Sequence, residues 1–80
     1  MKRIIAVLCP QVSNNHVVTR TAANEIVRDF ADVLWDNVEI DECVDGNVFR
    51  FPVECVDANA ARSLQAALVA VLVRHGLGPK

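Results

Sequence analysis

The dipeptide Asp45-Gly46 lies between two runs in which apolar and polar residues alternate, and this pattern limits the fold more than any other feature. Asp-Gly between alternating runs is a strong signal for a β-hairpin. If the two residues fill the central turn positions, Asp41 faces Arg50, and one face of the hairpin is apolar while the other is charged. Pro52 has no N–H, so we expect the second strand to be unpaired or bulged on one side there.

A strand and a helix are predicted before the hairpin. The continuous apolar run Lys2–Cys9 is typical of a strand buried on both faces. Apolar residues at spacings of three and four then predict a helix, N-capped by Thr19 or Thr21 and ending near Trp35 and Asp36. The apolar stripe of this helix consists of Ala23, Ile26, Val27, Phe30 and Leu34.

A second helix is predicted from about Ala58 to His75, with Asp57 as its N-cap and Gly76 just after its C-terminus. We expect its buried stripe to consist of Ala61, Leu64, Ala67, Leu68, Val71 and Leu72. With 80 residues, the chain is long enough for a single domain. The element order predicts an α+β fold, βαββα, with two helices packed on one face of a three-stranded sheet. This is the ferredoxin-like order lacking its last strand.

Acidic residues are concentrated in the middle of the chain. All ten carboxylates lie between Glu25 and Asp57, where Arg28 and Arg50 are the only basic residues, so this window carries a net charge of −8. One interpretation is a solvated face that keeps an apolar protein soluble. The other is a surface that binds a protein partner with a basic surface. The residues expected on that surface are Asp29, Asp32 and Asp36, which share one side of the first helix by their spacing, and Glu39, Asp41 and Asp45, which follow on the hairpin.

The second helix is apolar on nearly all sides. Two helices and a thin sheet cannot enclose such a helix completely, so its outer side is expected to form a homodimer contact or another protein-binding face. The residues of this expected face are Ala66, Val69, Ala70 and Val73.

The three cysteines Cys9, Cys43 and Cys55 are odd in number and far apart. This pattern is typical of reduced cysteines that act as small core hydrophobes in a reducing compartment, so we expect a cytoplasmic protein. The longest apolar stretches are too short for a membrane span or a signal peptide. The spacing of Cys and His residues does not fit a zinc site, and no cofactor motif is present, so no metal or cofactor is expected.

Two functional alternatives remain open. Cys9 follows a strand and precedes a polar loop, as the nucleophilic cysteine does in arsenate reductases, small tyrosine phosphatases and some phosphocarrier proteins. However, the C-x5-R pattern would require arginine at Asn15, and His16 has no supporting carboxylate nearby in sequence. A degenerate KH-like nucleic-acid binder also fits the element order, but the segment between Gln11 and Arg20 lacks the G-x-x-G loop, and the acidic middle would repel phosphates.

The sequence therefore predicts a small non-enzymatic protein-interaction module with no catalytic residues. It would act as an inhibitor or regulator that docks its acidic surface on a basic partner. Viral anti-defence proteins, such as inhibitors of CRISPR complexes, are comparable in size and charge. The alternatives are a Cys9-dependent phosphocarrier or thiol enzyme, and the degenerate KH-like nucleic-acid binder.

Overall fold

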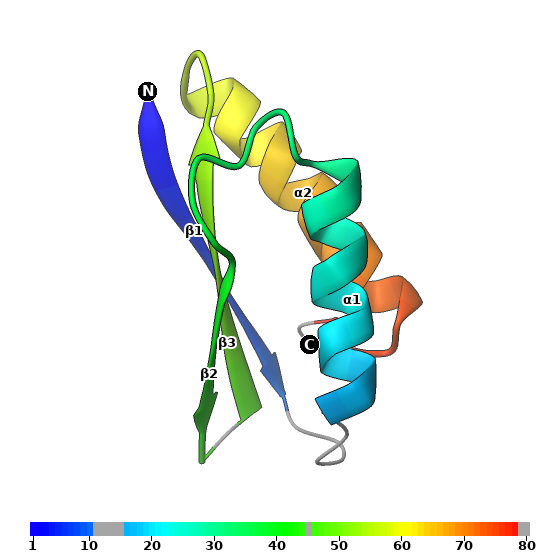
Figure 1. Cartoon of the computed structure of the whole chain (residues 1–80). Helices are drawn as coiled ribbons and strands as arrows, with labels where there is room; N and C mark the ends of the chain where they lie inside the picture. The colour runs from blue at the N-terminus through cyan, green and yellow to red at the C-terminus, as the bar shows by residue number, and fades with distance from the viewer. Residues whose placement is uncertain (11–15, 45, 79–80) are drawn as a thin grey trace.

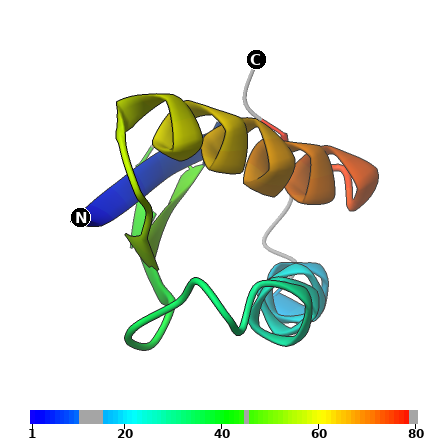
Figure 2. The ribbon, with the colours of Figure 1, turned by 90° about the horizontal axis from the view of Figure 1, so that it is seen from above.

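The computed structural model describes residues 1–10, 16–44 and 46–78. Three antiparallel strands form one sheet with the order β1-β3-β2, and both helices lie on one face of it (Figures 1 and 2). The elements in chain order are β1 (Lys2–Pro10), α1 (His16–Asp29), β2 (Glu39–Cys43), β3 (Gly46–Glu54) and α2 (Ala58–Arg74). The predicted α+β fold and βαββα order are thus confirmed.

The hairpin between β2 and β3 has a different register from the predicted one. Cys43 pairs with Gly46, so Val44 and Asp45 are the residues between the strands. Gly46 is the first residue of β3 and not a turn residue, and it has a φ of 146°, a conformation that other residues rarely adopt. The predicted pairing was wrong by two residues, which leaves each side chain on its predicted face because the side-chain period of a strand is two.

The predicted charge pair of the hairpin forms despite this change of register. Asp41 lies opposite Val48, and Arg50 lies opposite Glu39, yet Arg50 Nη1 donates to Asp41 Oδ2. The two side chains are diagonal neighbours on one face of the sheet, a separation that a long arginine side chain can span.

Pro52 lies where β3 lacks a regular neighbour on its β2 side. The pairing of β2 with β3 ends where Glu39 meets Arg50. Beyond that point the segment that follows α1 lies beside β3 in place of β2, and Trp35 N donates to Pro52 O over 3.0 Å. A residue in a strand directs its N–H and C=O to the same side, so the missing N–H of Pro52 leaves no β2 carbonyl unpaired. Pro52 therefore has no β2 neighbour, as predicted, but β3 is not unpaired there, because Leu34 of the segment after α1 bridges to Val53.

Only one face of β1 is covered, so the prediction of a strand buried on both faces was wrong. Ile5, Val7 and Cys9 are buried beneath the helices, whereas Ile4 and Leu8 are 51% and 47% exposed. Because both helices occupy the same side of the sheet, no helix among the described residues covers the second apolar row of β1 (Figure 2).

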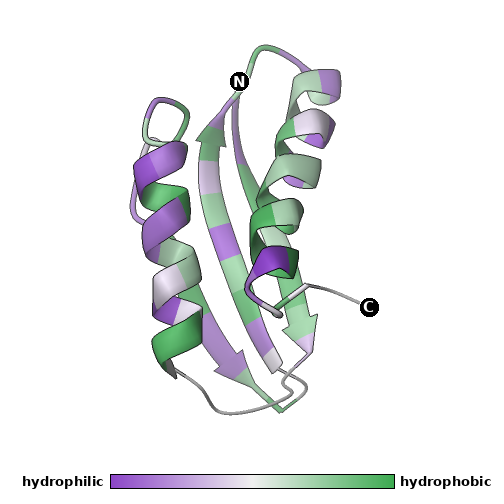
Figure 3. Cartoon of the chain, turned by 90° about the vertical axis from the view of Figure 1, so that its right-hand side faces the viewer, coloured by the Kyte–Doolittle hydropathy of each residue, from purple (hydrophilic) through white to green (hydrophobic). Residues whose placement is uncertain are grey.

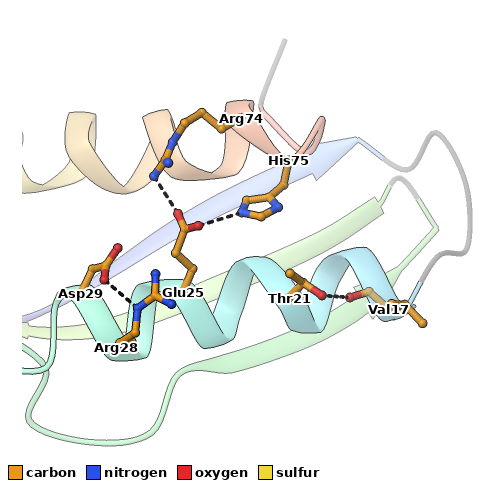
Figure 4. Close-up of polar contacts among 7 residues, drawn as sticks. All are labelled: Val17, Thr21, Glu25, Arg28, Asp29, Arg74 and His75. Carbon is orange, nitrogen blue, oxygen red and sulfur yellow. Dashed lines mark hydrogen bonds and ion pairs between the residues drawn. The ribbon is translucent and has the colours of Figure 1, made fainter.

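Helix α1 begins before its predicted cap. Thr19 and Thr21 lie inside the helix, so neither can serve as its N-cap. The hydroxyl of Thr21 donates instead to the carbonyl oxygen of Val17 one turn earlier, over 2.7 Å (Figure 4). The residues that precede His16 lie outside the described part of the chain.

Helix α1 also ends earlier than predicted, at Asp29. One further turn follows, in which Leu34 N donates to Phe30 O over 3.1 Å, and Leu34 then bridges to the end of β3. The buried side of the helix is rotated slightly from the predicted stripe, because Ala22 is fully buried while Val27 is exposed.

Helix α2 has the predicted caps. Asp57 Oδ1 accepts from Ala60 N at 2.8 Å, as an N-cap does. After the helix, Gly76 adopts a φ of 76°, and Leu77 N donates back to Leu72 O over 2.8 Å. This is the Schellman arrangement, in which glycine allows the chain to leave the helix without strain.

The core lies between the sheet and the two helices. Phe49 and Phe51 of β3 are fully buried, and their rings stack with centroids 5.9 Å apart. Leu68 and Leu72 of α2 are also fully buried, but Ala67, which was predicted in the buried stripe, is exposed. The central strand therefore supplies the largest side chains of the core.

Candidate functional site

The face of the sheet opposite the helices carries an uncovered apolar surface, which we call the outer face. Ile4 and Leu8 of β1 lie on it, and Ile4 pairs in register with Pro52. Trp35, which is 43% exposed, lies on the same side, since Lys2 Nζ is 4.9 Å from the centroid of its ring. A shallow hollow of about 220 Å³ is lined here by Ile4, Trp35, Asp36, Asn37, Glu39, Arg50 and Pro52.

Three exposed carboxylates border this apolar surface, and we call Asp36, Glu39 and Asp41 the acidic rim. Glu39 and Asp41 point to the outer face, because their partners on β3, Arg50 and Val48, alternate with the buried phenylalanines. Asp36 lines the same hollow as Trp35. Apolar and acidic side chains thus meet along the β2 side of the outer face.

The other predicted acidic residues are not part of this rim. Asp29 is exposed at the end of α1, and Asp32 is exposed in the turn that follows it. The expectation that Asp29, Asp32 and Asp36 share one side of a helix was wrong, because the helix ends before Asp32. Asp45 lies outside the described residues.

The carboxylate of Asp29 forms an ion pair with Arg28, its neighbour in sequence. Arg28 Nε donates to Asp29 Oδ1 over 2.9 Å, and this hydrogen bond holds the pKa of Asp29 below its usual value (Figure 4). Because the pair is exposed, it contributes little to folding. Asp29 therefore remains an acidic group at neutral pH, but part of its charge is neutralised by Arg28.

The expected dimer face on α2 is exposed for the most part. Ala66, Ala70 and Val73 are exposed, and Val69 is half-buried against the edge of the core. The opposite flank of the helix is tied to α1, where Glu25 accepts from Arg74 at 2.6 Å and lies 3.4 Å from the ring of His75 (Figure 4).

The cysteines differ in their surroundings. Cys9 is 1% exposed, and burial raises its pKa from 9.0 to about 11. A catalytic thiol requires the opposite shift. Cys55 is buried as well, whereas Cys43 is exposed, so the prediction of three core cysteines was wrong for Cys43. The side chain of His16 is outside the described part of the structure, and so is any pairing with Cys9.

We expect the thiol of Cys9 to resist alkylation. Under native conditions at about pH 8, iodoacetamide should modify Cys43 within minutes and leave Cys9 unmodified, since alkylation requires an accessible thiolate. Mass spectrometry of peptides identifies the modified site, and labelling in denaturant gives the reference rate. Cys43→Ser should abolish the fast reaction. Rapid native labelling of Cys9 would contradict the burial described here.

A second hollow is a groove of about 590 Å³ between α1 and β2. Its charged lining consists of Arg20 and Asp36, and the rest is apolar or amide in character. The residues that line it are Arg20, Ala23, Asn24, Val27, Ala31, Leu34, Trp35, Asp36, Asn37, Val38 and Ile40. The groove therefore offers apolar contact without a cluster of acid–base groups.

Within residues 1–10, 16–44 and 46–78, no group of three or more His, Cys, Asp or Glu side chains could hold a metal ion. No helix in the described part of the chain is long and apolar enough to cross a membrane. The chain matches no protein-family model, no curated protein and no solved structure.

The apolar centre of this site was not predicted from the sequence. Ile4, Leu8 and Trp35 were assigned to core or helix, whereas the structure leaves them on the outer face beside the acidic rim. A signal was present, because Lys2–Cys9 is apolar on both faces while only two helices were predicted to cover the sheet.

Proposed function

We propose that this chain is a non-enzymatic protein-binding module that docks its outer face and acidic rim on a partner with a basic surface. It would act in the cytoplasm as an inhibitor or regulator of that partner. The observation that carries the proposal is the exposed Trp35 beside Ile4, bordered by Asp36 and Glu39. Binding hot spots are commonly aromatic side chains at the centre of an interface, with polar groups around them.

The charges of the acidic rim define the chemistry of the partner. Within the described part of the chain, Asp36 and Glu39 form no ion pair with a basic side chain, while Asp41 is paired with Arg50. Two exposed carboxylates next to an apolar centre favour a partner surface that combines lysine or arginine with apolar side chains. The buried thiol of Cys9 and its raised pKa favour this function over the thiol-enzyme alternative.

The tryptophan provides the test, because Trp35 is the one tryptophan of the chain. We expect a short peptide of alternating lysine and leucine to shift its fluorescence to shorter wavelength in a saturable titration. Added salt should weaken this binding, since it screens exposed charges. A peptide with glutamate in place of lysine is the matched probe and should leave the fluorescence unchanged.

Variants of the rim make the test specific. The double change Asp36→Asn and Glu39→Gln should weaken binding of the lysine peptide by about tenfold, a loss of about 1.4 kcal/mol. Asp32→Asn removes an exposed carboxylate outside the rim and should leave the affinity unchanged. Equal binding of both peptides, or equal binding by wild type and the double variant, would exclude the acidic rim as the docking surface.

A further inference from the structure

Strand β1 has an open edge. It is an outer strand of the sheet, and within the described residues no strand pairs with its second side. Cys55 N donates to Met1 O, so the odd-numbered residues of β1 direct their backbone groups toward β3. The even-numbered residues direct theirs away from the sheet. These outward-directed residues are Lys2, Ile4, Ala6 and Leu8.

The two edge strands of the sheet, β1 and β2, differ in how well they are protected against pairing with another chain. β2 is a strand of five residues, and three of them, Glu39, Asp41 and Glu42, are acidic. Charged side chains and short length are devices that prevent an edge from pairing with another chain. β1 has nine residues, and its stretch from 4 to 9 contains no charge, glycine or proline. Nothing in the sequence of β1 opposes pairing there.

The exposed flank of α2 lies on the same side of the molecule as this edge. Leu68 and Leu72 face the sheet, and Val69 and Val73, one residue later, are rotated from them by about 100°. The contacts with Glu25 lie on the other flank, toward α1. Figure 3 shows α1 over one side of the sheet and α2 over the other, where β1 lies. The apolar flank of α2 therefore adjoins the open edge of β1.

We propose that β1 pairs with β1 of a second copy of this chain, antiparallel and related by a two-fold axis near Ala6. This pairing joins two three-stranded sheets into one, with Ile4 of one copy opposite Leu8 of the other on the outer face. The outward-directed N–H and C=O groups of Ile4, Ala6 and Leu8 then find partners.

The distribution of charge along β1 favours a second copy of the chain as the occupant, because it creates no repulsion. The basic residues of β1, Lys2 and Arg3, lie at one end of the strand, and the uncharged Cys9 and Pro10 lie at the other. Antiparallel pairing places each basic end against an uncharged end, so no like charges meet. The acidic β2 strands lie at the two far edges of the joined sheet, where the order β1-β3-β2 keeps them away from the contact.

The same two-fold axis brings the α2 flanks of both copies toward each other. Val73 is exposed and Val69 is half-buried, and these two side chains supply the apolar contact of this flank. A C2 interface is self-complementary in this way. The acidic rim stays open in the dimer, so this proposal and the proposed binding function can fail independently.

The test is the state of association of the full chain, measured by sedimentation equilibrium over a wide range of concentration. Wild type should form a dimer, and Ala6→Pro, which removes an outward-directed N–H, should raise the dimer dissociation constant by at least about tenfold. Val73→Lys on the α2 flank should have a similar effect. Val17→Lys introduces the same charge at an exposed valine of α1 and should leave the dissociation constant unchanged.

Amide hydrogen exchange of the wild type provides a second measurement, which does not depend on any variant being folded. The N–H groups of Ile4, Ala6 and Leu8 should become protected as the concentration rises. A protein that stays monomeric at high micromolar concentration would overturn the proposal. So would a dimer whose dissociation constant is the same in Val73→Lys, or assemblies that grow beyond two copies, which indicate pairing of β1 with the β2 edge.

Discussion

Replacing Phe51 by alanine is expected to remove most of the free energy of unfolding of this chain. Phe51 is fully buried in the central strand, where it pairs with Ile5 and its ring stacks on Phe49. Removing a buried phenylalanine side chain lowers the free energy of unfolding by about 3–5 kcal/mol, because transfer energy is lost and a cavity remains. Small domains have a total stability of about 5 kcal/mol or little more, so this loss consumes most of it.

Urea denaturation followed by circular dichroism, at one fixed protein concentration, measures this effect. The control is Val56→Ala, because Val56 is 87% exposed and its truncation should change the free energy of unfolding by no more than about 0.5 kcal/mol. If Phe51→Ala denatured at the same urea concentration as wild type, Phe51 would not occupy the centre of the core.

A second large effect is expected at α1, where Ile26→Ala should lower the free energy of unfolding by about 2–5 kcal/mol. Ile26 is fully buried and joins the helix to the sheet. This side chain carries much of the packing of α1, because Val27, the next residue, is exposed and lines the groove toward β2.

Val27, the next residue in the chain, provides the control for Ile26. Val27→Ala should change the free energy of unfolding by no more than about 0.5 kcal/mol, because the side chain is exposed and alanine favours a helix. Thermal unfolding of both variants gives the two values under identical conditions. A larger loss for Val27→Ala than for Ile26→Ala would show that Val27, and not Ile26, packs into the core.

The acidic surface illustrates why a site is harder to predict than an element. The spacing of Asp29, Asp32 and Asp36 suggested one side of a helix, but the helix ends at Asp29. Glu39 and Asp41 were assigned to the hairpin correctly, and their position beside Trp35 depends on how the segment after α1 crosses the end of β3. Such a contact joins residues that no local pattern relates.

The sequence by itself determined the order of the elements, the caps of α2 and the side of the hairpin on which each residue lies. These features depend on periodicity and on short-range chemistry, such as the carboxylate of Asp57 and the positive φ of Gly76. Only the tertiary structure decided the register of β2 on β3, the exposed row of β1 and the open edge beside α2. Each of these depends on which surfaces the two helices cover, and that is settled by packing between segments far apart in the chain.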